Sequence, residues 1–146
     1  TVKEILLNYE EQGQIFDAFC LLQPTSPLRT AQDIKNAYEI LKAASVAVVS
    51  VCKVEHSPMW CNNLPEDNSL NNFIMRANNK QRQAIKEFYR INGAIYFVRI
   101  PAFLEDAHLY REGSYAYLMP QTRSIDIDTE LDFQVAGICL KNKELL

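Results

Sequence analysis

Glycine is scarce in this sequence, with four residues among 146, and no glycine-rich segment forms a phosphate-binding loop. The dinucleotide-binding GxGxxG pattern and the P-loop are absent, as are the G-x-S-x-G and HExxH motifs of hydrolases. Only two histidines are present, His56 and His108, which argues against a histidine-based metal site. The chain therefore carries no phosphate cradle of its own and none of the standard catalytic signatures.

The cysteines are also uninformative as a group, because they are far apart and show no CxxC spacing. The four positions are Cys20, Cys52, Cys61 and Cys139. All but one lie inside apolar segments, which is typical of reduced, buried thiols and not of a disulfide framework or a zinc site. Residues 1–4 read as the start of a helix and not as a signal peptide. We therefore expect a cytoplasmic protein.

Charge and hydropathy exclude two further classes. The formal net charge is −3, so no basic surface for nucleic acid is expected. The longest apolar run, at residues 46–52, is too short to span a membrane. An apolar fraction of 48% is enough for a hydrophobic core, and 146 residues correspond to one domain or part of one. We expect neither a nucleic-acid partner nor a membrane.

The order of the predicted elements favours an α/β fold. Residues 16–22 and 45–54 are apolar runs typical of buried parallel strands. Between them, Thr30 and Asp33 have the spacing of a helix-capping pair, and helical apolar periodicity follows as far as Leu41. A strand, a helix and a strand in this order predict a right-handed parallel crossover. The expected architecture is a mainly parallel sheet flanked by helices.

Residues 55–87 interrupt this pattern with a polar, asparagine-rich stretch. Trp60, Phe73 and Met75 within it need a surface on which to pack. A partner subunit would supply that surface. We interpret the stretch as an excursion from the sheet and not as a linker.

Residues 124–133 (SIDIDTELDF) carry the most informative pattern. Read as a strand that runs into a helix, they place Asp126 and Asp128 on one face, because strand residues two apart project together. Neighbouring carboxylates at a strand end suit a hard cation such as Mg²⁺. A structural interpretation is also open: Thr129 and Asp132 resemble a capping pair, and Asp128 would favour the N-terminus of that helix.

Several polar residues near predicted strands have two interpretations each. Gln23 follows a strand, so its amide would bind either a ligand or nearby backbone. Arg29 suits a phosphate or carboxylate, or else is solvated. Arg82 and Arg90 suit a carboxylate ligand, with a surface salt bridge as the alternative. Tyr96 lies within a strand, either in the core or with its hydroxyl toward a pocket.

Three segments, in this order along the chain, resemble one family. They are residues 21–29 (LLQPTSPLR), 90–96 (RINGAIY) and 124–129 (SIDIDT), with His56-Ser57-Pro58 and Arg82-Gln83 between them. Over nearly the whole chain, they resemble the acylneuraminate cytidylyltransferases, the CMP-sialic acid synthetases. The resemblance implies a Rossmann-like nucleotide-diphospho-sugar transferase fold. It also implies cytidylyl transfer from CTP to a nonulosonic (sialic) acid with release of pyrophosphate, a reaction that depends on charge neutralisation and alignment.

The resemblance also implies roles for particular residues. Asp126 and Asp128 match the catalytic, Mg²⁺-binding pair of the family. Gln23 would contact the sugar or the nucleotide, and Asn92 and Tyr96 would face the sugar. CTP and the nonulosonic acid are the implied substrates, and Mg²⁺ is the implied cofactor.

The interruption at residues 55–87 matches the dimerisation arm of the family, so the resemblance implies a homodimer. Arg82 matches the arginine that this arm sends across the interface to the sugar carboxylate. Trp60 lies where some members have a basic residue, which leaves the identity of the acidic sugar open.

The family begins with a strand and a loop of the form PARGGSK that cradles the triphosphate, and nothing in this sequence matches it. We therefore expect residues 1–146 to be the C-terminal part of a single cytidylyltransferase domain, unable to turn over CTP alone. One alternative is a non-catalytic sugar-binding or dimerisation module of the same fold. Another is the same reaction on pseudaminic or legionaminic acid.

Overall fold

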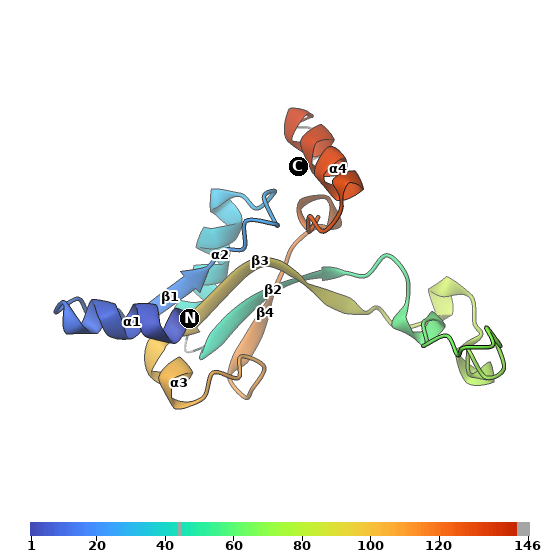
Figure 1. The fold of residues 1–146 in the computed structure, drawn as a ribbon, viewed down its shortest axis with the longest axis horizontal. Coiled ribbons are helices and arrows are strands. Elements are labelled where there is room, and N and C mark those ends of the chain that lie inside the picture. The colour runs from blue at the N-terminus through green and yellow to red at the C-terminus, as the bar shows by residue number, and fades with distance from the viewer. Residues whose placement is uncertain (44, 143–146) are drawn as a thin grey trace.

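The computed structural model describes residues 1–43 and 45–142, apart from the side chain of Arg82. In this part of the chain, helices surround a four-stranded sheet (Figure 1). The elements are α1 (Val2–Glu11), β1 (Ala18–Leu21), α2 (Ala31–Lys42), β2 (Ala47–Lys53), β3 (Tyr89–Arg99), α3 (Ile100–Glu105), β4 (Ser114–Leu118) and α4 (Glu130–Lys141). The fold is therefore α/β, as the sequence predicts.

The sheet is mixed, whereas the sequence predicted a mainly parallel one. Its strand order is β1-β3-β2-β4, and β3 is antiparallel to both β1 and β2. Only β2 and β4 form a parallel pair. β1 and β2 do point the same way across the helix between them, but β3 lies between the two strands. Apolar runs reveal buried strands without revealing their neighbours, which is why the sequence missed this insertion.

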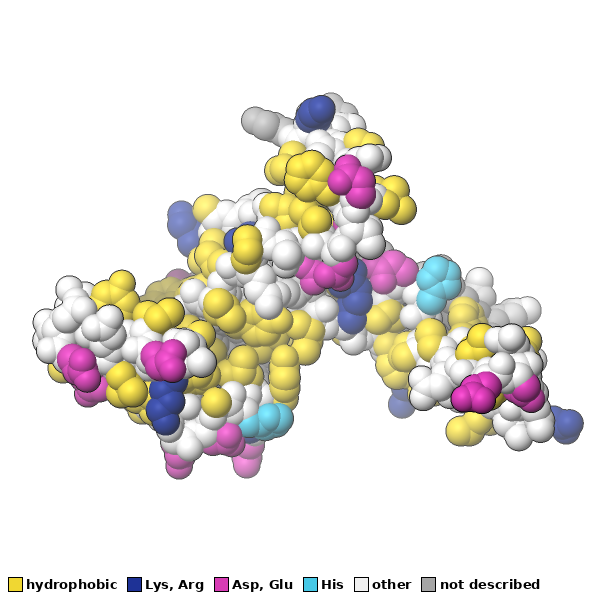
Figure 2. All heavy atoms as spheres, in the orientation of Figure 1, with side chains coloured by type: hydrophobic (Ala, Val, Ile, Leu, Met, Phe, Trp, Pro, Cys, Tyr) yellow, Lys and Arg dark blue, Asp and Glu magenta, His cyan; other side chains and the backbone are white. Residues whose placement is uncertain are grey.

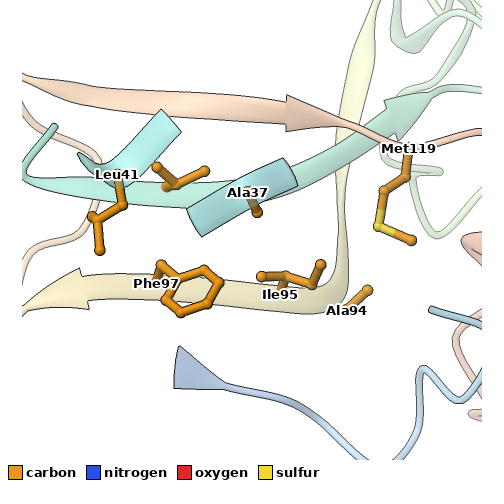
Figure 3. Close-up of a cluster of buried hydrophobic side chains, with 7 residues drawn as sticks. Ala37, Leu41, Ala94, Ile95, Phe97 and Met119 are labelled. Carbon is orange, nitrogen blue, oxygen red and sulfur yellow. The ribbon is translucent and has the colours of Figure 1, made fainter. Parts of the chain in front are cut away.

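One face of the sheet is covered by α2. The capping box predicted from Thr30 and Asp33 closes its first turn, because each side chain accepts a hydrogen bond from the backbone N–H of the other. The cluster buried beneath this helix consists of Ala37, Leu41, Val48, Ala94, Ile95, Phe97 and Met119 (Figure 3). Burial of each larger side chain contributes about 1.5–3 kcal/mol, so this cluster is the main stabilising contact between helix and sheet.

Residues 55–87, which we call the arm, connect β2 to β3 and project beyond the ends of both strands (Figure 1). The arm holds three short turns, η1 (Pro58–Trp60), η2 (Arg76–Asn78) and η3 (Arg82–Ala84). Trp60 is fixed within it, since its indole Nε1 donates to the Asn78 carbonyl at 3.1 Å. Leu70 and Met75 are 67% and 65% exposed. The predicted excursion from the sheet is present, and it carries uncovered apolar side chains.

None of the described helices is long and apolar enough to cross a bilayer. All four cysteines are unpaired, and two of them, Cys52 and Cys139, are buried. This agrees with the expectation of reduced thiols.

Candidate functional site

Residues 124–128 lead into α4 and belong to no strand. The predicted strand is therefore wrong. The reason is that the segment lies beside a loop: the Ile127 N–H donates to the Thr25 carbonyl at 2.8 Å. The alternation expected of a strand is nevertheless present, because Ile125 and Ile127 pack against a buried cluster that includes Leu28 and Ala136.

Asp126 and Asp128 line the same surface pocket, as the sequence predicted. The pocket has a volume of about 370 Å³. It is lined by Glu55, Arg90, Ile125, Asp126, Asp128, Leu131, Asp132 and Val135. In Figure 2, acidic side chains (magenta) gather beside a basic one (dark blue) below α4. Four carboxylates and one guanidinium line the pocket, so the pocket is acidic.

The predicted capping pair of Thr129 and Asp132 also forms. The Thr129 side chain accepts from the Asp132 N–H, and Asp132 Oδ2 accepts from the Thr129 N–H at 2.8 Å. Asp132 therefore satisfies the first turn of α4. Within the described residues, the Asp128 carboxylate accepts no hydrogen bond and forms no ion pair. Asp128 is exposed and remains free to bind a ligand.

The three sequence motifs meet at Gly93, which has a backbone φ of +72°. A Cβ atom at this position would lie 2.5 Å from Gln23 Oε1 and 2.8 Å from Ser26 Oγ. It would also lie 3.5 Å from Asp126 Oδ2. Glycine is required here both by the left-handed conformation and by the close approach of these side chains. Gln23 and Asp126, which are about a hundred positions apart in the sequence, are thereby brought to one point.

Arg29 has a structural role that the sequence did not indicate. Its Nη1 donates to the carbonyls of Gln23 at 2.7 Å and Ser26 at 2.6 Å. These charge-assisted bonds hold the loop between β1 and α2 in place. Arg29 is thus a structural part of the site that positions Gln23 and Ser26.

Asn92 is wholly buried and has protein partners on both sides of its amide. Its Oδ1 accepts from Ser50 Oγ at 2.6 Å, and its Nδ2 donates to Ser124 Oγ at 2.8 Å. Asn92 therefore links β2 and β3 to the segment that carries the aspartates. Its contact with a sugar stays a prediction, and the structure adds this internal role.

Two further predicted residues differ in their relation to the site. Tyr96 is half-buried on β3, and burial, together with Tyr110 and the negative charge of Asp126, raises the pKa of its hydroxyl. Arg82 lies in η3 of the arm, and its side chain is outside the described part of the structure. The arm projects away from the sheet, so Arg82 is not among the residues that meet at Gly93 (Figure 1).

Arg90 connects the base of the arm to the aspartate segment. Its Nη2 donates to Glu55 Oε1 at 3.0 Å and to the Ser124 carbonyl at 3.2 Å. The hydrogen bond with Arg90 lowers the pKa of Glu55 and, in return, raises the pKa of Arg90. The salt-bridge alternative considered from the sequence is therefore the correct one for Arg90.

The donor set suits Mg²⁺ if substrate completes the coordination. Among the described residues, no group of three or more His, Cys, Asp or Glu side chains is arranged to hold a metal. Mg²⁺ is usually bound by one or two carboxylates plus substrate phosphates and water. Asp126 and Asp128 in one pocket meet that requirement.

Comparison with known proteins reveals a consistent set of relatives, although no family model matches the chain. The chain is 31% identical over its whole length to the CMP-N,N'-diacetyllegionaminic acid synthase of Legionella pneumophila, of which it covers 64%. Over 90% of its length it is 32% identical to an N-acylneuraminate cytidylyltransferase of Streptococcus agalactiae, covering 31% of that protein. It is 29% identical to a pseudaminic acid cytidylyltransferase of Campylobacter jejuni, over 90% of the chain and 57% of the relative.

The chain is related over 90% or more of its length to the acylneuraminate cytidylyltransferases. The resemblance inferred from the three motifs is thus confirmed. The chain spans 64% or less of the length of these relatives. The relatives are named for three different acidic sugars, so this relationship leaves the sugar open.

The sequence did not reveal two residues that help to build this site. Ser26 is wholly buried between Asn92 and Asp126, but a serine between two prolines carries no distinct signal. Arg123 forms a buried ion pair with Asp33, with Nη2 2.8 Å from Oδ1. The sequence indicated the role of Asp33 in capping α2 but not its ion pair with Arg123.

Proposed function

We propose that the protein containing this chain transfers CMP from CTP to a nonulosonic acid and releases pyrophosphate. One observation carries the proposal: in a chain of this family, Asp126 and Asp128 line one pocket beside the point where all three motifs meet. Phosphoryl transfer requires alignment and electrostatic stabilisation more than covalent chemistry, and a site built from carboxylates and amides supplies both.

In the proposed reaction, the anomeric hydroxyl oxygen of the sugar attacks the α-phosphorus of CTP. A bond forms from that oxygen to phosphorus, the bond from phosphorus to the bridging oxygen breaks, and pyrophosphate leaves while the hydroxyl loses its proton. Asp126 and Asp128 would hold Mg²⁺, which neutralises charge on the phosphates. Gln23 orients the sugar or nucleotide through its amide, and the Tyr96 hydroxyl faces the sugar.

We further propose that the protein is a homodimer joined through the arm. The arm exposes Leu64, Leu70 and Met75, and side chains of this kind are normally covered in an assembly. Arg82 lies on the arm, and its guanidinium suits the carboxylate of a sugar bound to the partner.

The wider setting of the chain is part of the same proposal. Residues 1–146 form part of a single cytidylyltransferase domain with a Rossmann-like nucleotide-diphospho-sugar transferase fold. The mixed, helix-flanked sheet is compatible with that fold. Four unpaired cysteines support a cytoplasmic location.

The test is to identify the product. The complete protein is incubated with CTP, Mg²⁺ and, separately, N-acetylneuraminic, N,N'-diacetyllegionaminic and pseudaminic acid, and the products are analysed by mass spectrometry. We expect the CMP adduct of at least one acid. If a folded protein forms no CMP adduct with any of the three, the proposal is wrong.

A further inference from the structure

Ser26 is a buried hydroxyl that contacts one of the proposed metal ligands. Its side chain is inaccessible to solvent. Its Oγ lies 3.0 Å from the Asn92 carbonyl oxygen and 3.3 Å from Asp126 Oδ1. One hydroxyl proton thus has two acceptors. A hydrogen bond to an ionised carboxylate is stronger than one to a neutral carbonyl, so the charged oxygen competes well for that proton.

The surroundings of Ser26 hold its hydroxyl in place. The Ser26 carbonyl accepts from Arg29 Nη1 at 2.6 Å, and the Ser26 N–H donates to the Gln23 carbonyl at 3.3 Å. The Asn92 side chain is itself bonded to Ser50 and Ser124. Both the donor and its neighbouring acceptor therefore belong to the rigid core of the domain.

Only one oxygen of Asp126 is engaged in this way. Oδ1 faces Ser26, whereas Oδ2 lies toward Gly93, 3.5 Å from where a Cβ atom would be. Asp128 is exposed and has no comparable bond among the described residues. The two carboxylates thus differ: one is held by the protein and the other adapts to its ligand.

We propose that Ser26 is a positioning residue that holds Oδ1 of Asp126, so that Oδ2 is presented to Mg²⁺. This inference rests on the proposed function, in which Asp126 and Asp128 bind the ion. Carboxylate ligands are commonly oriented by such outer hydrogen bonds, and their removal typically weakens metal affinity about 10–100-fold. We expect a change of that size for Ser26→Ala.

The experiment compares Ser26→Ala with Ser45→Ala in the complete protein. Ser45 is also buried, and its Oγ donates to the Ile40 carbonyl at 2.7 Å, so Ser45→Ala removes one buried hydrogen bond away from the aspartates. Mn²⁺ binding is measured by electron paramagnetic resonance with CTP present, and the Mg²⁺ concentration for half-maximal turnover is measured in parallel. Ser26→Ala is expected to weaken Mn²⁺ binding about 10–100-fold, with most turnover recovered at saturating Mg²⁺. Ser45→Ala is expected to leave both unchanged.

Two outcomes overturn the proposal: unchanged Mn²⁺ affinity in folded Ser26→Ala, and no Mn²⁺ binding by the unsubstituted protein. Ser26→Cys keeps the volume and donates weakly, so its affinity is expected to fall between those of serine and alanine. Ser26→Cys decides the matter if the alanine variant does not fold. A third outcome separates this proposal from the proposed function. If the protein binds Mn²⁺ through Asp126 but forms no CMP-sugar, the proposed function is wrong, whereas the positioning role of Ser26 is not contradicted.

Discussion

Replacing Arg123 with methionine should destabilise the fold, because it removes the charged partner of the buried Asp33 carboxylate. Arg123 Nε and Nη2 donate to Asp33 Oδ2 and Oδ1 at 3.0 and 2.8 Å. The Asp33 side chain is 1% exposed, and that of Arg123 is 19% exposed. Asp33 lies in the first turn of α2, and Arg123 directly precedes the segment with the proposed metal ligands. The ion pair therefore ties the candidate site to the main helix.

The size of the effect follows from the pKa of Asp33. Burial alone raises this pKa, but hydrogen bonds from Arg123, Thr30 and Tyr117 outweigh burial and bring it to about 2. The folded-state pKa is lowered, so the stabilisation is complete above the unfolded pKa of about 3.9 and is lost as the pH falls toward 2. The difference between the two pKa values corresponds to about 2–3 kcal/mol of stability. Breaking a buried ion pair costs about 3–5 kcal/mol of stability. Because Thr30 and Tyr117 still donate to Asp33, we expect Arg123→Met to lower the free energy of unfolding by about 2–4 kcal/mol.

Urea unfolding at several pH values from 2 to 7 measures this effect. The free energy of unfolding of Arg123→Met should be lower than that of the unsubstituted protein at pH 7. The difference between the two should shrink as the pH falls from about 4 toward 2, because the unfolded chain binds a proton at Asp33 before the folded, unsubstituted protein does. Arg99→Met is the matched control, because Arg99 donates to the Leu41 carbonyl and has no carboxylate partner among the described residues. A loss in Arg123→Met that stays constant down to pH 2 would refute the reasoning, since it would originate in packing and not in charge.

Three further predictions concern the site and the arm. Asp126→Ala and Asp128→Ala in the complete protein should each abolish CMP-sugar formation and leave the circular dichroism spectrum unchanged; near-normal turnover in either would reject the metal assignment. Gly93→Ala should lower the free energy of unfolding by about 1–3 kcal/mol in urea, because alanine is strained at φ +72° and its Cβ would meet Gln23 and Ser26. Leu70→Asp should shift the sedimentation coefficient toward that of a monomer, and an unchanged coefficient would exclude Leu70 from the interface.

Features encoded by local patterns were predictable from the sequence. The capping pairs Thr30–Asp33 and Thr129–Asp132 both form, because a cap depends only on residues three apart. Alternation placed Asp126 and Asp128 in one pocket even though no strand forms there. Such patterns depend on short-range geometry and persist when the longer-range arrangement differs.

Features that depend on distant parts of the chain were not predictable. The insertion of β3 between β1 and β2 follows from pairing across the arm, and apolar runs do not specify such partners. The burial of Asn92 and the contact between Ser26 and Asp126 likewise require the fold to be complete. Without the resemblance to a family, neither the reaction nor the convergence at Gly93 could have been inferred from spacing alone.

The proposed function depends on metal-dependent cytidylyl transfer supported by Asp126 and Asp128. It is tested most directly by pyrophosphate release from CTP in the complete protein, with and without a nonulosonic acid, Mg²⁺ and the Asp126→Ala substitution. We expect release only when CTP, the acid and Mg²⁺ are all present, and none from Asp126→Ala. Equal release from Asp126→Ala, or release that persists after Mg²⁺ is removed with a chelator, would contradict it.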